Sequence, residues 1–275
     1  MTVFSTKLNT IANNTNSYLK SFFLKQKNNS YLLKPMKYGV FSGGKRFRSA
    51  IVVNTGKIYD LNYKKLIIIG SAIECLHSYS LIHDDLPSMD NDELRRGKLS
   101  VHKKFNEFTA ILAGNSLLTL AFEILSGKDL QLSKNYKNEL ITTLSICAGH
   151  SGLAGGQYFD LTFENKSILK KNIINMQKKK TGELFGFCCE SIAIIKGVNS
   201  TKRKQLKKIG INIGLLFQTV DDLIDHKGDS SIVGKPTKSD KKKGKATLVN
   251  LLGYEETVNF AKNLKKKIDQ QIKKY

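Results

Sequence analysis

The chain has 275 residues, of which 40% are hydrophobic and 25% charged, which is the composition of an ordinary globular protein and excludes a disordered chain. This length allows one large domain or two small ones. The formal charge of +22 comes almost wholly from lysines spread along the chain, which favours solvated helix faces over a nucleic-acid-binding surface.

The predicted elements are helices throughout, because apolar residues recur with helical spacing and the chain has only three prolines. We therefore expect an all-α fold, a single domain over residues 1–275. The expected helices are an amphipathic one within residues 1–30, one opened by GVFSGGKRFR near residue 39, and others over 64–85, 110–125, 139–148, 170–196, 204–225 and 247–275. SGLAGGQ reads as a glycine-rich turn, 226–245 as a long polar loop, and no strand is predicted.

The lack of a recognisable signal peptide and the pattern of cysteines predict a cytoplasmic protein without a membrane span. The N-terminus has no apolar core of signal-peptide length. The longest apolar run, residues 66–82, is interrupted by Glu74 and His77 and is too short to cross a bilayer comfortably. We expect the four cysteines to be small buried residues in a reducing compartment, since none forms a C-x-x-C pair.

The first acidic motif, HDDLPSMDNDE, lies where the predicted helix over 64–85 ends. Asp84 and Asp85 come at the helix C-terminus, and Asp90, Asp92 and Glu93 follow. The helix macrodipole is negative at this end, so the cluster is costly unless cations lie in it. Oxygen-ligated divalent ions meet that need, and magnesium also binds substrate phosphates.

The second acidic motif is QTVDDLID. At 100° per residue, four polar side chains share one helix face, and an apolar stripe on the opposite face is expected to pack into the core. The polar residues are Gln218, Asp221, Asp222 and Asp225, and the stripe is Ile209, Ile213, Phe217, Val220 and Ile224. One such motif is as often a solvated helix end as a metal site. Two of them, each ending an apolar helix, could clamp three metal ions on one diphosphate if they face each other across a cavity.

Basic groups near these motifs suggest anion sites. GVFSGGK matches G-x-x-x-x-G-K, but Arg46 replaces the Ser or Thr that a nucleotide-binding loop needs, so we expect a diphosphate site without metal. A lone helical histidine such as His77 is more often a satisfied core residue, and a lone lysine is more often solvated. Arg95 and Arg96 are adjacent, so they point to different sides. The candidates are Lys45, Arg48, His77, Arg95, Arg96, Lys180, Thr181, Lys235 and Lys245.

Taken together, these stretches resemble the trans-prenyltransferase (polyprenyl synthetase) family, and within it the bacterial farnesyl diphosphate synthases. The matching pieces are GGKRFR, LIHDDLPSMDNDELRRG, GGQYFD, KTG, FQTVDDLID and GKPTKSDKKKGKAT, in family order and spacing over about residues 38–253. The resemblance implies helices around a deep central active-site cavity, usually in a homodimer. It implies a transferase of isoprenoid biosynthesis that uses Mg²⁺, up to three ions per site.

The resemblance also implies roles for individual residues. The metal ligands would be Asp84, Asp85, Asp90, Asp221, Asp222 and Asp225. The catalytic residues would be Asp84, Asp85, Asp90, Asp221, Asp222 and Lys180. The allylic diphosphate would contact Arg95, Lys180, Thr181, Gln218, Lys235 and Lys245. Isopentenyl diphosphate would contact Lys45, Arg48, His77 and Arg96. The family's C-terminal basic cover would be shortened here or supplied by Lys273 and Lys274.

The expected reaction is the head-to-tail condensation of isopentenyl diphosphate with dimethylallyl or geranyl diphosphate, mainly to the C15 product. Tyr79 lies five residues before Asp84, about 7.5 Å deeper along the helix, where its ring could close the cavity. Ser80 beside it offers little obstruction, and Tyr79 could instead only pack in the core. The main product could also be C20 or C10. A terpene cyclase, which DDLID disfavours, and a non-enzymatic polyanion-binding helical protein are the rival functions.

Overall fold

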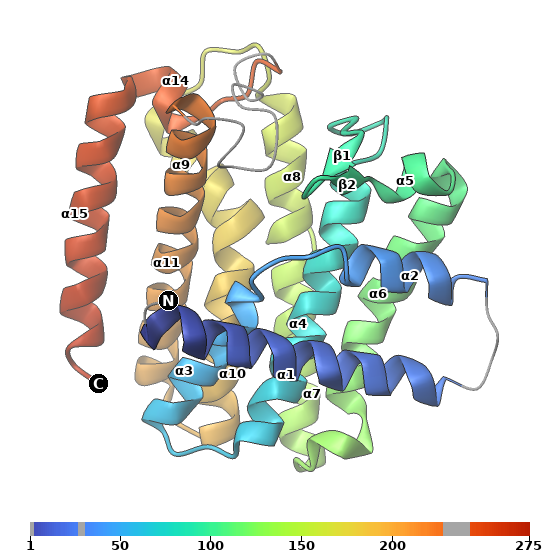
Figure 1. The fold of residues 1–275 in the computed structure, drawn as a ribbon. Coiled ribbons are helices and arrows are strands. Elements are labelled where there is room, and N and C mark those ends of the chain that lie inside the picture. The colour runs from blue at the N-terminus through green and yellow to red at the C-terminus, as the bar shows by residue number, and fades with distance from the viewer. Residues whose placement is uncertain (1–2, 27–30, 228–242) are drawn as a thin grey trace. The chain divides into compact units, whose positions relative to one another are not determined.

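The structure, a computed structural model, describes residues 3–26, 31–227 and 243–275 (Figure 1). The chain divides into two compact units, residues 1–141 and 142–275, which are described one at a time. Both units are helical, which confirms the predicted fold class. In the described ranges the only sheet is one short antiparallel hairpin. A single domain over the whole chain stays a prediction.

The first unit is built around α4, which packs against α3 on one side and α6 on another. Helix α4 is buried on nearly every side, with Leu66, Ile69 and Leu76 fully buried. The elements are α1 (Val3–Lys25), α2 (Leu33–Val40), α3 (Phe47–Ile58), α4 (Tyr63–Asp84), β1 (Leu94–Arg95), β2 (Lys98–Leu99), α5 (Val101–Lys104), α6 (Glu107–Ser126), η1 (Lys128–Leu130) and α7 (Lys134–Ala148), which continues into the second unit.

Local sequence explains where α4 and α6 begin. The side chains of Asn62 and Asn106 cap the two helices by accepting hydrogen bonds from the backbone N–H of Lys65 (3.3 Å) and Thr109 (2.8 Å). An asparagine cap satisfies one of the N–H groups left over at a helix start. Pro87 follows α4 by three residues, and the helix ends at Asp84, one residue before the predicted end.

In the second unit, α11 packs along α10 and is flanked by α15 (Figure 1). The elements are α8 (Leu153–Thr162), α9 (Lys170–Gln177), the π-helical turn η2 (Lys178–Gly182), α10 (Glu183–Lys196), α11 (Ser200–Lys227), α14 (Leu248–Leu252) and α15 (Tyr254–Ile272). Leu248 of α14 packs with Ile173 and Met176 of α9 in a small core.

Several predicted elements were wrong in detail. SGLAGGQ is not only a turn, because α8 begins within it at Leu153. The predicted helix over 170–196 is interrupted by η2, and the final helix is broken at Gly253, whose φ of +81° favours glycine. Helix α2 and the β1–β2 hairpin were missed, since two-residue strands carry no detectable alternation.

Two helices, α4 and α6, are long and apolar enough to cross a membrane by length and composition alone. Helix α4 extends beyond the apolar run noted in the sequence, so length does not exclude a span. Its apolar window is 78% buried inside the structure, as in the core helix of a globular protein, whereas that of α6 is 44% buried. This test by itself is weak evidence for a membrane segment.

Candidate active site

The first acidic motif closes a tight turn at the end of α4. Asp84 is the last helical residue, and the backbone N–H of Asp90 donates to the carbonyl of Asp84 at 2.9 Å. Asp84 and Asp90 are half-buried, whereas Asp85 is only 2% exposed. The turn therefore brings the two ends of the DDxxxxD motif together, although six positions separate them in the sequence.

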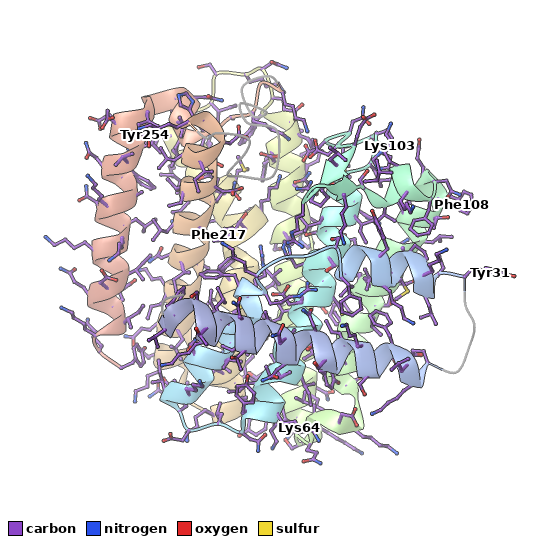
Figure 2. The ribbon with its side chains drawn as sticks, viewed as in Figure 1. Tyr31, Lys64, Lys103, Phe108, Phe217 and Tyr254 are labelled. Atoms are coloured by element: carbon purple, nitrogen blue, oxygen red, sulfur yellow. The ribbon has the colours of Figure 1, made fainter. Side chains whose placement is uncertain are left out.

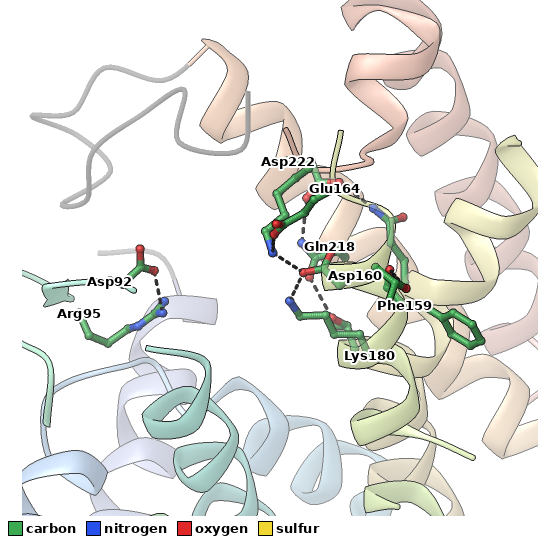
Figure 3. A network of polar contacts seen from close by, with 12 residues as sticks. Asp92, Arg95, Phe159, Asp160, Glu164, Lys180, Gln218 and Asp222 are labelled. Atoms are coloured by element: carbon green, nitrogen blue, oxygen red, sulfur yellow. Dashed lines mark hydrogen bonds and ion pairs between the residues drawn. The ribbon is translucent and has the colours of Figure 1, made fainter. Parts of the chain in front are cut away.

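Arg95 of β1 holds this motif together from one side. Its Nε donates to Asp85 Oδ1 at 2.9 Å, and its Nη2 also contacts Asp85. The same Nη2 donates to Asp92 Oδ2 at 3.2 Å (Figure 3). Burial raises the pKa of Asp85 above its ordinary value, although Arg95 opposes that shift. The acidic cluster thus contains a cation, as the helix macrodipole argument requires.

Arg96 points away from its neighbour, as the sequence predicted. It has a left-handed backbone with φ +56°, and its Nη1 donates to the carbonyl of Gly43 at 2.5 Å. A Cβ on Gly44 would lie 2.6 Å from Arg96 Cζ, and Gly44 has φ +107°. Glycine is needed here because the guanidinium lies directly on the loop backbone.

His77 lies among arginine side chains in the same unit. Its own burial lowers the pKa well below the ordinary value, and Arg48, Arg96, Arg46 and Arg95 lower it further by repulsion. His77 is therefore neutral near pH 7 and can donate one hydrogen bond. Arg48 is half-buried and Lys45 exposed, and the arginines near His77 supply the positive charge that would attract an anion.

Arg46 has a structural role instead. It is 4% exposed, contacts Glu74 of α4 at 3.5 Å and donates from Nε to Asn16 Oδ1 at 2.9 Å. Glu74 Oε1 also accepts from the backbone N–H of Ser49 at 3.3 Å. This buried ion pair fixes the start of α3 and hence the loop that carries the candidate anion site.

Glu74→Gln should lower the free energy of unfolding by about 3 kcal/mol, because it keeps the side-chain volume but leaves the charge of Arg46 buried without its counter-ion. Urea unfolding followed by circular dichroism measures this change. Lys25→Gln is the control, since it removes an exposed ion pair whose side chains are 67% and 47% exposed. Equal, small effects of both changes would contradict the structural role of the buried pair.

The proposed chain-length residues differ in their surroundings. Ser80 is 7% exposed and donates its hydroxyl hydrogen bond to the carbonyl of His77 at 2.9 Å, within its own helix. Tyr79 is half-buried, and burial together with the nearby charge of Asp84 raises its pKa. Its ring meets the ring of His83 edge-on, at 4.8 Å between centroids.

In the second unit, the acidic motif of α11 is part of a chain of hydrogen bonds. Gln218 Nε2 donates to Asp222 Oδ1 at 2.8 Å, and Gln177 Nε2 donates to Asp222 Oδ2 at 2.7 Å. Thr181 Oγ1 donates to Gln218 Oε1 at 2.9 Å. Asp222 and Asp225 are buried and Asp221 is half-buried. Two members of the predicted polar face of α11, Gln218 and Asp222, thus belong to one hydrogen-bond network (Figure 3).

The predicted apolar stripe opposite this face was wrong in its second half. Ile209 is buried, but Phe217, Val220 and Ile224 are 40%, 40% and 41% exposed. The buried positions in this part of the helix are Leu215, Thr219 and Leu223 instead. The buried face of α11 therefore includes Asp222, which accepts a hydrogen bond from Gln177 of α9, and Asp225.

Asp160 of α8 is a site residue that sequence reasoning missed. Its Oδ2 accepts from Lys180 Nζ and from Lys245 Nζ, both at 2.8 Å, and Lys245 also contacts Glu164 at 2.8 Å (Figure 3). Burial alone would raise the pKa of Asp160, but the two ammonium groups lower it below its ordinary value. The GGQYFD motif, which ends in this aspartate, was the sequence signal that could have identified it.

Lys235, another predicted ligand of the allylic diphosphate, lies outside the described residues.

The turn that carries Lys180 and Thr181 is itself irregular. It is the π-helical η2, a form that is often found at functional sites. Helix α8 packs against it so closely that a Cβ on Gly156 would lie 2.1 Å from the backbone nitrogen of Lys180. The glycine therefore lets α8 bring Asp160 up to the lysine.

Gln157, the residue after this glycine, was also missed. It is 7% exposed, and neither of its amide atoms has a hydrogen-bond partner among the described residues. Burying an amide without a hydrogen-bond partner costs free energy of folding. The position therefore favours a polar group that the described chain does not supply.

Lys273 and Lys274 do not cover the acidic end of α11. Helix α15 ends beside the start of α11, where Asn212 Nδ2 donates to Gln271 Oε1 at 3.2 Å and Tyr275 donates to Gln205 at 3.3 Å. Gln205 precedes Asp221 by about 24 Å along the helix axis. The expectation that these lysines supply a basic cover was wrong, because α15 packs antiparallel to α11.

Each acidic motif, taken within its own unit, offers oxygen donors that fit magnesium bound together with a phosphate. Among the described residues, no three His, Cys, Asp or Glu side chains gather closely enough to hold a metal ion by themselves. Mg²⁺ commonly takes only one or two carboxylates and completes its shell with water and substrate phosphate oxygens. Asp84, Asp90 and Asp221 offer such oxygens at half-buried positions.

Comparison with known proteins agrees with these features. The polyprenyl synthetase family model matches residues 29–275. The farnesyl diphosphate synthase of Micrococcus luteus is 42% identical over 226 residues, covering 82% of this chain and 77% of that protein. The Escherichia coli K12 farnesyl diphosphate synthase is 38% identical over 247 residues, covering 89% and 83%.

Solved structures show the same relationship. An FPP/GFPP synthase from Zymomonas mobilis superposes with a TM-score of 0.84 at 37% identity, covering 98% of this chain and 94% of that one. A Helicobacter pylori geranyltransferase, complexed with magnesium and isoprenyl diphosphate, gives 0.83 at 33% identity, covering 97% and 90%. The chain therefore belongs to the polyprenyl synthetase family.

Proposed function

We propose that the chain is a prenyltransferase that condenses isopentenyl diphosphate with dimethylallyl and geranyl diphosphates, in the presence of Mg²⁺, to give mainly farnesyl diphosphate. The observation that carries this proposal is that each unit has an aspartate motif toward the end of a long helix and buried or half-buried cations: Arg95 contacts the first motif, and Lys180 and Lys245 contact Asp160 in the second unit. The relatives from Micrococcus luteus and Escherichia coli bear the name of farnesyl diphosphate synthase, which supports the C15 product over C10 or C20.

The residues divide between two diphosphates. Lys45, Arg48, His77 and Arg96 bind isopentenyl diphosphate, where neutral His77 adds a hydrogen bond to the charges of its neighbours. The allylic diphosphate is bound by Arg95, Lys180, Thr181, Gln218, Lys235 and Lys245. Asp84, Asp85, Asp90, Asp221, Asp222 and Asp225 would hold the Mg²⁺ ions, up to three of them. Arg95 contacts the aspartates through Nε and Nη2, so its Nη1 can reach a phosphate oxygen.

The reaction follows from this distribution of charge. When bound, Mg²⁺ neutralises the developing charge of the leaving diphosphate. Lys180 and Arg95 donate hydrogen bonds to the same group, so the allylic C–O bond breaks and leaves a carbocation. The double bond of isopentenyl diphosphate, oriented by Arg48 and His77, forms the new C–C bond. One proton then leaves, and the released diphosphate accepts it, so no protein nucleophile is required.

We also propose that the enzyme is a cytoplasmic homodimer. The support is an apolar surface on α6, where Phe108, Ile111 and Leu112 are 66%, 42% and 46% exposed (Figure 2 shows Phe108). An exposed apolar cluster on one helix is typical of a protein–protein contact. Sedimentation equilibrium of the wild type and of Ile111→Glu tests this assembly.

Incubation with isopentenyl and geranyl diphosphates and Mg²⁺, followed by product-length determination, tests the proposed activity. We expect C15 as the main product and no turnover after chelation of divalent ions. A chain that yields no elongated product, or that binds DNA tightly with steep salt dependence instead, would contradict the proposal.

The two diphosphate sites should separate in steady-state kinetics. Arg48→Ala or His77→Ala should raise KM for isopentenyl diphosphate by about tenfold more than KM for the allylic substrate, because each removes a donor from one site only. Lys180→Ala should do the reverse. If every variant weakened both substrates equally, the assignment of these residues to separate sites would be wrong.

A further inference from the structure

His83 of α4 links Tyr79 to the neighbouring helix α6. It follows Tyr79 by four residues, and side chains at this spacing share one face of a helix. The His83 side chain is directed back over the preceding turn, as helical side chains generally are, and its ring meets the Tyr79 ring edge-on at 71° with centroids 4.8 Å apart. The two rings therefore limit each other's rotation.

The other side of His83 is fixed by the backbone of α6. Its Nε2 lies 3.1 Å from the carbonyl oxygen of Ile111. A carbonyl can only accept, so Nε2 carries the proton and donates it to that oxygen. A Cβ at Gly114 would lie 2.2 Å from Nε2 and 2.4 Å from Cδ2 of the histidine. The Nε2–Cδ2 edge of the ring thus occupies the space on α6 that the missing side chain of Gly114 leaves open.

Tyr79 lacks an anchor of its own. Its side chain is half-buried, and its hydroxyl has no hydrogen-bond partner in the described part of the chain. Without such a partner, the position of the ring depends on its packing neighbours. Ser80 does not help to hold it, since its hydroxyl is bonded to the carbonyl of His77.

We propose that His83 is the positioning residue for Tyr79, and that the contact from Ile111 and Gly114 through His83 to Tyr79 sets the length of the product. This inference rests on the proposed function, in which the Tyr79 ring stops the growing chain. His83 acts through the aromatic contact and not by touching the substrate, because its donor nitrogen is used by Ile111.

The test measures the ratio of C20 to C15 products from geranyl diphosphate, together with kcat. His83→Ala should raise this ratio by about tenfold. This change corresponds to about 1.4 kcal/mol in the difference between the activation free energies of elongation to C20 and of release of the C15 product. His83→Phe keeps a ring above Gly114 and against Tyr79, so its ratio should stay within about twofold of the wild type. Asn115→Ala, an exposed change beside Gly114, is the control and should leave the ratio and kcat unaltered.

A double-variant cycle separates positioning from a direct role. Tyr79→Ala alone should lengthen the products, and adding His83→Ala should then change the ratio no further, since the residue it positions is gone. If His83→Ala does not fold, His83→Gln serves in its place, because it can keep the bond to Ile111 but has no ring.

Three results would overturn the inference. The first is a wild-type ratio in His83→Ala or, in its place, His83→Gln. The second is an equal shift by His83→Ala in the Tyr79→Ala background. The third is a rise of the ratio in His83→Phe as large as in His83→Ala. A wild-type chain that makes no C15 product would instead overturn the proposed function, and the inference with it.

Discussion

Asp84→Ala and Asp221→Ala should each lower kcat by about a hundredfold to a thousandfold while leaving the helix content unchanged. Each change removes a carboxylate that we assign to the metal ions on the allylic diphosphate, and the loss of one electrostatic contact to a leaving group commonly costs this much. Both side chains are half-buried and neither belongs to the apolar core, so we expect the fold to tolerate either change. Steady-state turnover and far-ultraviolet circular dichroism measure the two quantities.

The control is Asp269→Ala, which removes an exposed carboxylate of α15 that pairs with Lys265 at 2.7 Å. It should leave kcat within about twofold of the wild type, because exposed ion pairs contribute little. Full activity in Asp84→Ala or in Asp221→Ala would rule out a metal clamp made by both motifs.

Asp160→Asn should damage stability and activity together. It leaves the ammonium groups of Lys180 and Lys245 close together without the carboxylate that both contact at 2.8 Å. Lys245 is 8% exposed, so the charge is poorly solvated. We expect a loss of about 2–3 kcal/mol in the free energy of unfolding, reduced somewhat because Lys180 is 24% exposed. The KM for geranyl diphosphate should rise as both lysines move.

The loss of stability caused by Asp160→Asn should depend on pH in a defined direction. The two lysines outweigh burial and hold the pKa of Asp160 below its ordinary value of 3.8. A carboxyl group with a lowered pKa in the folded state stabilises the protein above the unfolded-state pKa, and that contribution is lost as pH falls through the folded-state value. The difference in unfolding free energy between wild type and Asp160→Asn should be full at pH 7 and shrink below pH 3.8. A constant difference down to acid pH would contradict the ionic role of Asp160.

Part of the candidate site could be predicted from the sequence, because its residues interact with partners only a few positions away in the chain. Asp84 and Asp85 end an apolar helix, so the unfavourable dipole pointed to a cation, and Arg95 provides one ten residues later. The opposite directions of Arg95 and Arg96 also followed from their adjacency. Asp160 could not be found in this way, because a single aspartate on a helix has no local feature that marks it as buried.

The sequence by itself determined that the protein is helical, where its two aspartate motifs lie and to which family it belongs. These properties depend on helical periodicity and on short motifs, which act over a few residues. Only the tertiary structure decided which polar groups share a buried environment, since it joins Lys245 to Asp160 across 85 residues and Gln177 to Asp222 across 45. It also decided that Asp222 near the end of α11 is buried while Phe217 is 40% exposed, because the buried carboxylate accepts a hydrogen bond from Gln177 of α9 and a buried polar group needs such a partner.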